Sequence, residues 1–299
     1  MQKVPSWIRA SLPKWLWDRW IKRYGEAAAW DFAISLNSPP QAALRLAGSF
    51  TKPELIPFDV VESNLVPEAY IKVSNSSAPI AAAQDRNTFQ FQDEASQLIP
   101  YLLEPFQAKR VWDACAAPGG KTAILCKICG MSGQVVASDL RPERVARLAR
   151  FSKSTDSLNP DILVADAAKP SPFRSYFDAV LADVPCSGLG TLRRNPEIKW
   201  RFQPGELAAL QIAQKNILHF VSEAVGVGGR LLYSTCSTEP EENEQVINFF
   251  LNTHPGFCLE RPTHPTGIAA WTNEDSMVRT YPSKHLWDGF FAALMTRRS

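Results

Sequence analysis

The chain has 299 residues, enough for one large domain or for a domain and a smaller module. A hydrophobic content of 45% and a formal net charge of +2 are typical of an ordinary globular protein, and this charge alone does not indicate a nucleic-acid binder. No apolar run approaches the roughly 20 residues of a membrane span, and the N-terminus has no secretory signal. We therefore expect a cytoplasmic protein that does not enter a membrane.

Residues 1–25 combine basic and aromatic side chains. The basic ones are Lys3, Arg9, Lys14, Arg19, Lys22 and Arg23, against Asp18 alone, and the aromatic ones are Trp7, Trp15, Trp17, Trp20 and Tyr24. This mixture suits phosphate attraction and base stacking, as in RNA binding. It equally suits an amphipathic helix that packs its tryptophans on a core and exposes a basic face. The two interpretations are compatible, and both stay open.

The first part of the chain is predicted to be a small module at residues 1–78. A helical run from Lys14 to Leu36 ends at Asn37-Ser38-Pro39-Pro40, a strong helix breaker. Short strands are predicted at Ala43–Leu46 and Glu68–Val73. The polar stretch from Ser74 to Pro79 is the best candidate for a linker, so we place the second domain at residues 79–299.

From about residue 90, predicted strands alternate with predicted helices. The strands lie at Arg110–Ala114, Gln134–Asp139, Asp161–Asp166, Phe177–Asp183 and Arg230–Tyr233, with Phe257–Glu260 and Phe290–Thr296 as the last candidates. The helices lie at Lys121–Cys129, Pro142–Phe151, Glu206–Ala224 and Glu241–Asn252. This alternation predicts an α/β fold with a doubly wound, mostly parallel sheet.

A glycine-rich turn follows the first of these strands, in the segment Asp113-Ala-Cys-Ala-Ala-Pro-Gly-Gly-Lys-Thr122. Paired glycines at a strand-to-helix turn let backbone N–H groups approach a ligand closely. The ending Gly120-Lys121-Thr122 is that of a Walker A loop, but this motif needs glycine where Cys115 stands. The segment therefore argues against a P-loop NTPase.

Three later strands each end in an acid, namely Asp139, Asp166 and Asp183. An acid after the second strand, following a glycine-rich first turn, is the arrangement that binds ribose hydroxyls in nucleoside-binding α/β folds. A single Asp at such a place more often caps the next turn, but three at successive strand ends favour a ligand. A ligand with a ribose, an adenine and little phosphate suits S-adenosylmethionine better than ATP.

Two apolar runs end in a cysteine among small polar residues, in Asp183-Val-Pro-Cys186-Ser and in Tyr233-Ser-Thr-Cys236-Ser. Groups at the carboxyl ends of strands in an open α/β sheet face the ligand crevice. We therefore expect Asp183, Cys186 and Cys236 to form a reactive centre at this edge of the sheet.

The six cysteines are predicted to be free thiols in a reducing compartment. Cys126 and Cys129 form a lone CxxC pair in a predicted helix, and the histidines are not spaced to complete a zinc site. Residues three apart share a helix face, so we expect this pair to pack in the core and the protein to bind no metal.

Four segments resemble, in order, the motifs of the Sun/Nop-type RNA cytosine-5 methyltransferases: DACAAPGGKT, VASDLRPERV, DVPCSGLGTLRRNPEIKW and YSTCSTEPEENEQV. The resemblance extends to Phe91–Ser96, to Asp288–Phe291 and to an RNA-binding lead-in from Pro13 to Leu46, nearly the whole chain. It implies a class I S-adenosylmethionine-dependent methyltransferase, Rossmann-like, with a small N-terminal α+β RNA-binding module. Bacterial members usually carry a NusB-like domain before this lead-in, which we expect this protein to lack.

The resemblance also implies roles for single residues. The methionine end of S-adenosylmethionine would be held by Cys115, Ala116, Ala117, Pro118, Gly119, Gly120 and Lys121, the ribose by Asp139 and the adenine side by Asp166. Asp183 would border the methyl group and the target base. Cys236 matches the nucleophile of the family, and Cys186 its second cysteine, linked to product release. Retaining both cysteines favours RNA over DNA.

The expected chemistry needs a thiol because carbon 5 of cytosine is a poor nucleophile. A thiolate that adds to carbon 6 makes carbon 5 electron-rich, after which methyl transfer, loss of the carbon-5 proton and elimination of the thiolate follow. Lys121 or the pair Arg193-Arg194 could activate Cys236. Asp183 would hydrogen-bond the ring, for which we expect its pKa to be raised.

Basic residues after the first cysteine are the predicted RNA contacts, namely Arg193, Arg194 and Lys199, together with Arg23. The alternative is a solvated basic loop with Trp200 buried beneath it. We expect a monomer that methylates RNA, most of all ribosomal RNA. A methyltransferase for tRNA or another RNA, and a non-catalytic RNA-binding assembly factor, stay open as alternatives.

Overall fold

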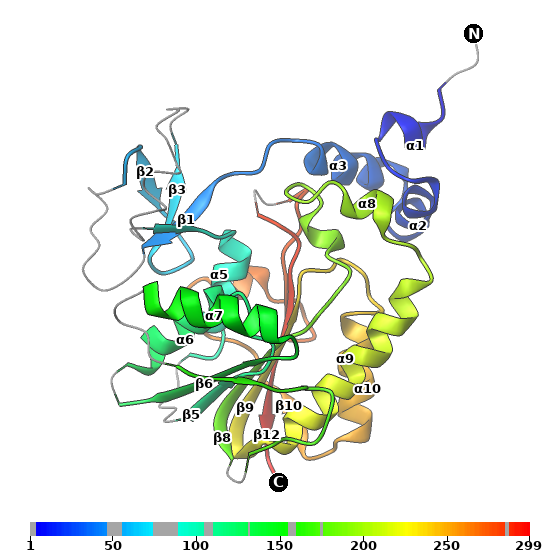
Figure 1. Ribbon diagram of the computed structural model, residues 1–299. Helices are drawn as coiled ribbons and strands as arrows, with labels where there is room; N and C mark the ends of the chain where they lie inside the picture. Colours follow the sequence, from blue (N-terminus) through cyan, green and yellow to red (C-terminus); the bar gives the residue numbers. More distant parts are fainter. Residues whose placement is uncertain are drawn as a thin grey trace.

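The computed structural model describes residues 4–46, 56–73, 89–104, 110–130, 132–154, 160–173, 176–284 and 287–299. They form a large mixed sheet with helices on both faces and, beside it, a small antiparallel sheet and the N-terminal helices (Figure 1). Within these ranges, no helix combines the length and the apolar character needed to cross a membrane.

Eight strands of the described chain make up the large sheet. They are β5 (Arg110–Asp113), β6 (Gln134–Asp139), β7 (Asp161–Val164), β8 (Phe177–Asp183), β9 (Val225–Thr235), β10 (Phe257–Leu259), β11 (Met277–Arg279) and β12 (Phe291–Arg297). Their order is β10-β12-β9-β8-β5-β6-β7, with β11 paired to β12. Strands β5 to β9 run parallel, and β12 is antiparallel to β9. The predicted doubly wound, mostly parallel α/β sheet is confirmed.

Helices cover both faces of this sheet (Figure 1). They are α5 (Glu94–Tyr101), α6 (Gly120–Cys129), α7 (Pro142–Ser154), α9 (Glu206–Glu223) and α10 (Glu244–Thr253). The short helix α8 (Ile198–Arg201) lies beside the N-terminal helices, and η2 (Leu189–Thr191) and η3 (Ile268–Trp271) are single 3-10 turns. Side chains alternate along a strand. Val111 therefore packs on the side of α5 and α6, and its neighbour Trp112 on the side of α9 and α10. Burial on both faces explains why the strands are continuous apolar runs in the sequence.

The sheet changes its winding direction at β5. From there the chain passes to β6 and β7 on one side, and it returns with β8 and β9 on the other. In open α/β sheets, ligands bind outside the carboxyl ends of the strands at such a point. These ends carry Asp113, Asp139, Asp183 and Thr235. The predicted acids and the two cysteine segments therefore share one edge of the sheet.

The N-terminal module contains α1 (Ser6–Arg9), α2 (Lys14–Tyr24), α3 (Glu26–Leu36), β1 (Ala43–Leu46), β2 (Val60–Glu62), β3 (Ala69–Lys72) and β4 (Phe89–Phe91). Its antiparallel sheet has the order β2-β3-β1-β4. The single helix predicted from Lys14 to Leu36 is wrong, because Gly25 interrupts it with a φ of 81°. Glycine adopts this left-handed conformation readily since it has no Cβ.

Strand β4 extends the small sheet beyond the boundary predicted at residue 78. Leu44 of β1 lies opposite Phe91, and Leu46 lies opposite Phe89. A boundary at residue 78 would divide this sheet, so the module is better ended after β4. The predicted linker at residues 74–79 lies outside the described residues.

The aromatic residues of the N-terminal helices pack in a core. Trp17 lies 4.8 Å from Trp30, and Trp20 lies 4.5 Å from Phe32, measured between ring centroids. The same cluster includes Leu189, which follows β8 of the large sheet. The interpretation of these tryptophans as core residues is therefore confirmed, and their cluster fixes the helices to the part of the chain that contains the large sheet.

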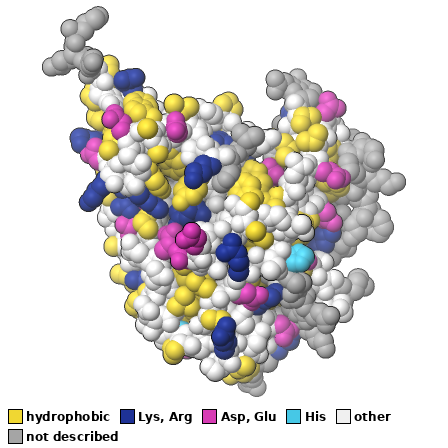
Figure 2. Space-filling model, turned by 180° about the vertical axis from the view of Figure 1, so that it is seen from behind, with side chains coloured by type: hydrophobic (Ala, Val, Ile, Leu, Met, Phe, Trp, Pro, Cys, Tyr) yellow, Lys and Arg dark blue, Asp and Glu magenta, His cyan; other side chains and the backbone are white. Residues whose placement is uncertain are grey.

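The basic side of these helices faces solvent. Arg9, Lys14 and Lys22 are exposed, and Figure 2 shows basic side chains gathered over the N-terminal helices, next to the end of the chain. Elsewhere on that face, basic and acidic side chains alternate. The basic face predicted from the sequence therefore exists in the structure, opposite the tryptophan core.

Candidate active site

The two cysteine segments meet at the carboxyl edge of the large sheet. Strands β8 and β9 are parallel neighbours with Asp183 opposite Ser234. The sulfur atoms of Cys186 and Cys236 lie 3.1 Å apart, and the backbone N–H of Cys236 donates to Cys186 Sγ at 3.3 Å. The structure thus brings together the two thiols that the sequence predicted to share a site.

The surroundings make these two thiols chemically unequal. The hydrogen bond with Cys236 raises the pKa of Cys186 well above its ordinary value, and burial and the charge of Glu242 act in the same direction. Cys186 is therefore held as a neutral thiol that can donate to the sulfur of Cys236. A donor of this kind stabilises a thiolate, which is the form of cysteine that attacks.

Asp183 lies beside the thiols in an ion pair. Its carboxylate accepts from Lys121 Nζ at 2.7 Å and from Ser234 Oγ at 2.7 Å. Lys121 and Ser234 therefore each occupy one oxygen of the carboxyl group, whereas we expected Asp183 to contact the target base. The expected proton sharing with the base would therefore require Lys121 to release Asp183.

Lys121 is a fixed cation within range of the thiols. Burial acts to lower its pKa, but the charge of Asp183 and the hydrogen bond to it outweigh burial, and the pKa is raised. The charge of Cys236 contributes in the same direction. Lys121 is therefore the predicted activating group whose charge interacts with Cys236.

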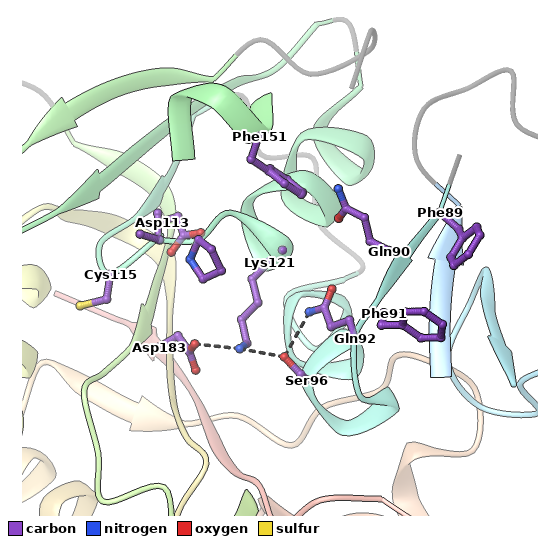
Figure 3. A pocket seen from close by; sticks show the side chains of 14 residues that line it. Phe89, Gln90, Phe91, Gln92, Ser96, Asp113, Cys115, Lys121, Phe151 and Asp183 are labelled. Carbon is purple, nitrogen blue, oxygen red and sulfur yellow. Dashed lines mark hydrogen bonds and ion pairs between the residues drawn. The ribbon is translucent and has the colours of Figure 1, made fainter. Parts of the chain in front are cut away.

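A pocket of about 500 Å³ opens beside Asp183, between the large sheet and the N-terminal module (Figure 3). One wall is the predicted cofactor loop, with Cys115, Ala116, Ala117, Pro118, Gly120 and Lys121. The other contains Phe89, Gln90, Phe91, Gln92 and Ser96, with Phe151 of α7 at the rim. Lys121 Nζ donates across the pocket to Ser96 Oγ at 3.1 Å. The pocket has the size of a small-molecule site.

Asp113, the last residue of β5, lines this pocket and has a buried oxygen without a partner among the described residues. It is buried, and its Oδ2 accepts from Thr122 Oγ1 at 2.7 Å, whereas Oδ1 has no hydrogen-bond partner among the described residues. Burial raises the pKa of Asp113 to about 7. An unpaired buried carboxylate oxygen is costly, so the pocket favours a ligand with an ammonium group. S-adenosylmethionine carries one, and the residues present therefore fit this cofactor.

Asp139 and Asp166 are engaged in local hydrogen bonds. Asp139 accepts from the backbone N–H groups of Ala117 and Arg141, each at 3.3 Å, and pairs with Arg144 at 3.3 Å. Asp166 accepts from the backbone of Ala168 at 3.0 Å. These bonds cap turns, the alternative raised for a single Asp, and neither residue lines the pocket of Figure 3. Their contact with ribose and adenine stays a prediction.

The backbone of the cofactor loop depends on close packing at Gly119. Its φ is 115°, and an added Cβ would lie 2.8 Å from side-chain atoms of both Leu148 and Phe151. Helix α7 can therefore pack directly on the loop only because this residue is glycine. Gly119 itself does not line the pocket, so its contact with the cofactor stays a prediction.

Glu242 is a buried acid that joins the two cysteine segments, and the sequence analysis missed it. Its Oε1 accepts from Ser187 N at 2.8 Å and from Gln214 Nε2 at 3.0 Å, and its Oε2 accepts from the hydroxyls of Ser187 and Ser237. Ser187 follows Cys186, and Ser237 follows Cys236. One carboxyl group therefore holds both segments. The motif YSTCSTEPEENEQV contains Glu242, but three nearby acids made the right one impossible to choose.

The predicted RNA contacts near Cys186 need correction. Arg193 is buried and donates to the carbonyls of Ser35 and Pro282. Lys199 is also buried and donates to Asn37 Oδ1 at 3.2 Å. These side chains are used inside the fold, because partners from distant segments surround them. The alternative prediction was a solvated basic loop with Trp200 buried beneath it. It is wrong for Trp200, which is 55% exposed.

Arg194 is likewise committed to the fold. It pairs with Asp93 at 2.7 Å and with Asp288 at 2.9 Å, two carboxyl groups that are largely buried. Burial and the charge of Asp93 raise the pKa of Asp288 to about 7, against the opposing effect of Arg194. Arg194 therefore ties the start of α5 to the C-terminal segment and is not free for RNA.

Arg23 anchors helix α2 to the segment after Cys236. It donates to Thr238 O at 2.6 Å, and Trp20 Nε1 donates to the buried carboxyl group of Glu239 at 3.3 Å. Arg19 of the same helix forms ion pairs with Glu239 and Glu241. The N-terminal helices therefore support the segment that contains the candidate nucleophile. Arg23 could contact RNA only in competition with its hydrogen bond to Thr238 O.

Cys126 and Cys129 pack against the core beneath α5, as predicted. Burial raises the pKa of Cys126 to about 12. Within the part of the chain that the structure describes, no cluster of three or more His, Cys, Asp or Glu side chains could hold a metal ion.

Comparisons with known proteins agree with this arrangement. Residues 100–296 match the model of a family described as 16S rRNA methyltransferase RsmB/F. The chain belongs to this family. Probable ribosomal RNA small subunit methyltransferases B from Synechocystis sp. and from Bacillus subtilis are each 31% identical to it. These alignments cover 98% and 96% of this chain and 68% and 67% of those proteins, so the chain spans about two thirds of their length.

A solved structure supports the same assignment. The methyltransferase homolog protein from Pyrococcus horikoshii is 25% identical, with a TM-score of 0.78 and 97% of each chain covered. As a member of the RsmB/F family, the protein is an RNA methyltransferase that depends on S-adenosylmethionine. The predicted class I methyltransferase fold, RNA methyltransferase activity and S-adenosylmethionine cofactor are confirmed.

Proposed function

We propose that this RsmB/F-family enzyme methylates carbon 5 of a cytosine in small-subunit ribosomal RNA, through a covalent bond between Cys236 and carbon 6 of the base. The observation that carries the proposal is the pair of thiols 3.1 Å apart, beside Asp183 at the carboxyl edge of the sheet. Activation of a pyrimidine ring by a thiolate needs a nucleophile and a proton donor or acceptor at one place. Both are present here.

Cys236, Asp183 and Cys186 have different roles in the proposed reaction. Cys236 attacks as the thiolate, stabilised by the hydrogen bond from Cys186 and by the charge of Lys121. Asp183 lies where it can accept a hydrogen bond from the amino group of cytosine, which directs the ring without needing a proton on the acid. After a base removes the carbon-5 proton, Cys186 can donate to the departing sulfur of Cys236, which helps the product leave.

S-adenosylmethionine supplies the methyl group as an electrophilic sulfonium. The loop at residues 115–121 and Asp113 would hold its methionine end, and Asp139 and Asp166 would hold its ribose and adenine after small side-chain changes. The target base must leave its stack to be reached by Cys236.

Exchange of the cysteines tests the proposal. Cys236→Ser should abolish methyl transfer, and Cys186→Ala should accumulate a covalent protein–RNA adduct that survives denaturing electrophoresis. An adduct formed by Cys236→Ser with Cys186 intact would reverse the assigned roles. Absence of transfer to cytosine from the wild-type protein with labelled cofactor and small-subunit RNA would refute the reaction itself.

The RNA target and the setting are also proposals. Ribosomal RNA is favoured over tRNA because the family description and the relatives named above refer to small-subunit ribosomal RNA. Six free thiols fit the reducing cytoplasm, and we propose a monomer there. Bisulfite sequencing of RNA from cells without the protein would identify the cytosine, and light scattering would measure the mass.

A further inference from the structure

Arg45 of β1 is a buried cation without an acidic partner among the described residues. It is 8% exposed, and within the described part of the chain its guanidinium donates to two neutral groups, Gln90 Oε1 at 2.6 Å and Gln92 Oε1 at 3.1 Å. Burial lowers its pKa to about 10. Arg194 and Lys121, by contrast, each pair with an acid. A buried charge is costly unless an opposite charge compensates it, so this region favours an anion.

Gln90 and Gln92 lie between the guanidinium of Arg45 and the pocket, and the charge of Arg45 orients their amide groups. A guanidinium can only donate, so both amide oxygens face it and both amide NH₂ groups point away. Gln92 Nε2 donates to Ser96 Oγ at 3.1 Å. Gln90 Nε2 has no hydrogen-bond partner in the described chain, and Figure 3 shows this side chain reaching into the pocket toward Phe151. The pocket therefore contains an unused donor polarised by a buried cation.

These groups belong to the wall formed by the N-terminal module. Arg45 and Gln90 lie opposite each other in the register of β1 and β4. The cofactor loop, with its own backbone donors, forms the other wall, and the charge of Lys121 on that side is matched by Asp183. The positive charge without a counter-charge is therefore on the module side of the pocket.

We propose that the module wall of the pocket binds a phosphodiester group of the RNA substrate, close to the target cytosine, through the amide of Gln90 and the charge of Arg45. The inference rests on the proposed function, since it assumes that RNA enters this pocket. A phosphate fits because it brings the missing negative charge and accepts hydrogen bonds from an amide NH₂. The carboxylate of the cofactor is the less suited anion, because the loop on the opposite wall can bind it.

Gln90→Glu separates this role from folding. The new carboxylate would give Arg45 an acidic partner at the present 2.6 Å contact, so the variant should unfold at the same urea concentration as the wild type or a higher one. In RNA binding, however, it would repel a phosphate. We expect the Kd for small-subunit ribosomal RNA transcribed in vitro to rise at least tenfold, with an unchanged Kd for S-adenosylmethionine. The slope of log Kd against log salt should fall by about 0.7, the value of one phosphate contact on a single strand.

Gln245→Glu is the matched control. It makes the same charge change at an exposed position of α10, where the side chain accepts from Gln211 Nε2 and can continue to do so. Its Kd for RNA should stay within twofold of the wild type. Arg45→Met, which removes the charge, should weaken RNA binding in the same way as Gln90→Glu.

Three outcomes would overturn the proposal. If Gln90→Glu and Arg45→Met both bind RNA like the wild type, the wall is only structural. If Gln90→Glu weakens cofactor binding and leaves RNA binding intact, the anion is the carboxylate of the cofactor. A loss of RNA affinity equal to that of Gln245→Glu would show a general charge effect. All readouts are binding constants, so a failure of the wild type to methylate cytosine would refute the proposed reaction without touching this result.

Discussion

Replacement of Glu242 should separate the two functions of a buried carboxyl group, hydrogen-bond acceptance and charge. The side chain is fully buried, and its Oε1 accepts from two groups that can only donate, Ser187 N and Gln214 Nε2. Glu242→Ala leaves Ser187 N without a partner, whereas Gln214 Nε2 keeps its hydrogen bond to Pro185 O at 3.0 Å. An unsatisfied buried donor costs about 1–3 kcal/mol, so the variant should lose about 1–3 kcal/mol of unfolding free energy. The serine hydroxyls add little, because they already lie 3.2 Å apart and can bond each other.

Glu242→Gln should be mild by the same reasoning. Its amide oxygen can keep both N–H donors, and its NH₂ group can donate to the hydroxyls of Ser187 and Ser237, which rotate to accept. We expect a loss of at most about 1 kcal/mol. In methyl transfer from labelled cofactor at a temperature where both variants are folded, Glu242→Ala should lower kcat more than it raises KM, since the two cysteine segments are no longer joined.

Urea unfolding and steady-state kinetics measure these effects, with Glu223→Ala on the exposed surface of α9 as the control, expected within about 0.5 kcal/mol of the wild type. An unfolding free energy of Glu242→Ala within about 1 kcal/mol of the wild type would refute the geometric reasoning. Equal damage by Glu242→Gln and Glu242→Ala would show that the charge of the group matters and not its position as an acceptor.

Three further results are expected. Gly190→Ala places a Cβ 1.9 Å from Gly289 O, so the turn after Cys186 must shift and kcat should fall at least about tenfold in the methyl-transfer assay. Asp113 has its pKa raised by burial to about 7, so the folded state binds its proton more tightly than the unfolded state, and the wild type loses stability as the pH rises from about 4 to 7. Asp113→Asn should remove this loss, with urea unfolding showing equal stability near pH 4 and a more stable variant above pH 7. Arg194→Met breaks a largely buried ion pair and should lower the unfolding free energy by about 3 kcal/mol. The salt dependence of RNA binding should not change, and a lower slope of log Kd against log salt would show that Arg194 does contact RNA.

The sequence alone was sufficient for the sheet and for the meeting of the two cysteine segments. Strand ends in parallel sheets share one edge, so two cysteines that each follow a buried strand were predicted to meet, and Cys186 and Cys236 lie 3.1 Å apart. The same rule predicted the cofactor loop as a wall of the pocket. These predictions need only the periodicity of strands and the topology of α/β folds, both of which are local or general properties.

Tertiary structure alone decided which polar residues are available to a ligand. Arg194 and Arg45 are equally basic in the sequence, yet the first meets two acids from distant segments and the second meets two amides. Glu242 joins Ser187, 55 positions away, to Ser237. Whether a charged side chain is available to a ligand depends on its partners in space. The free-energy cost of leaving such a group unpaired is larger when the group is buried. Partners so far apart in the chain follow no period or spacing, so only the folded structure shows them.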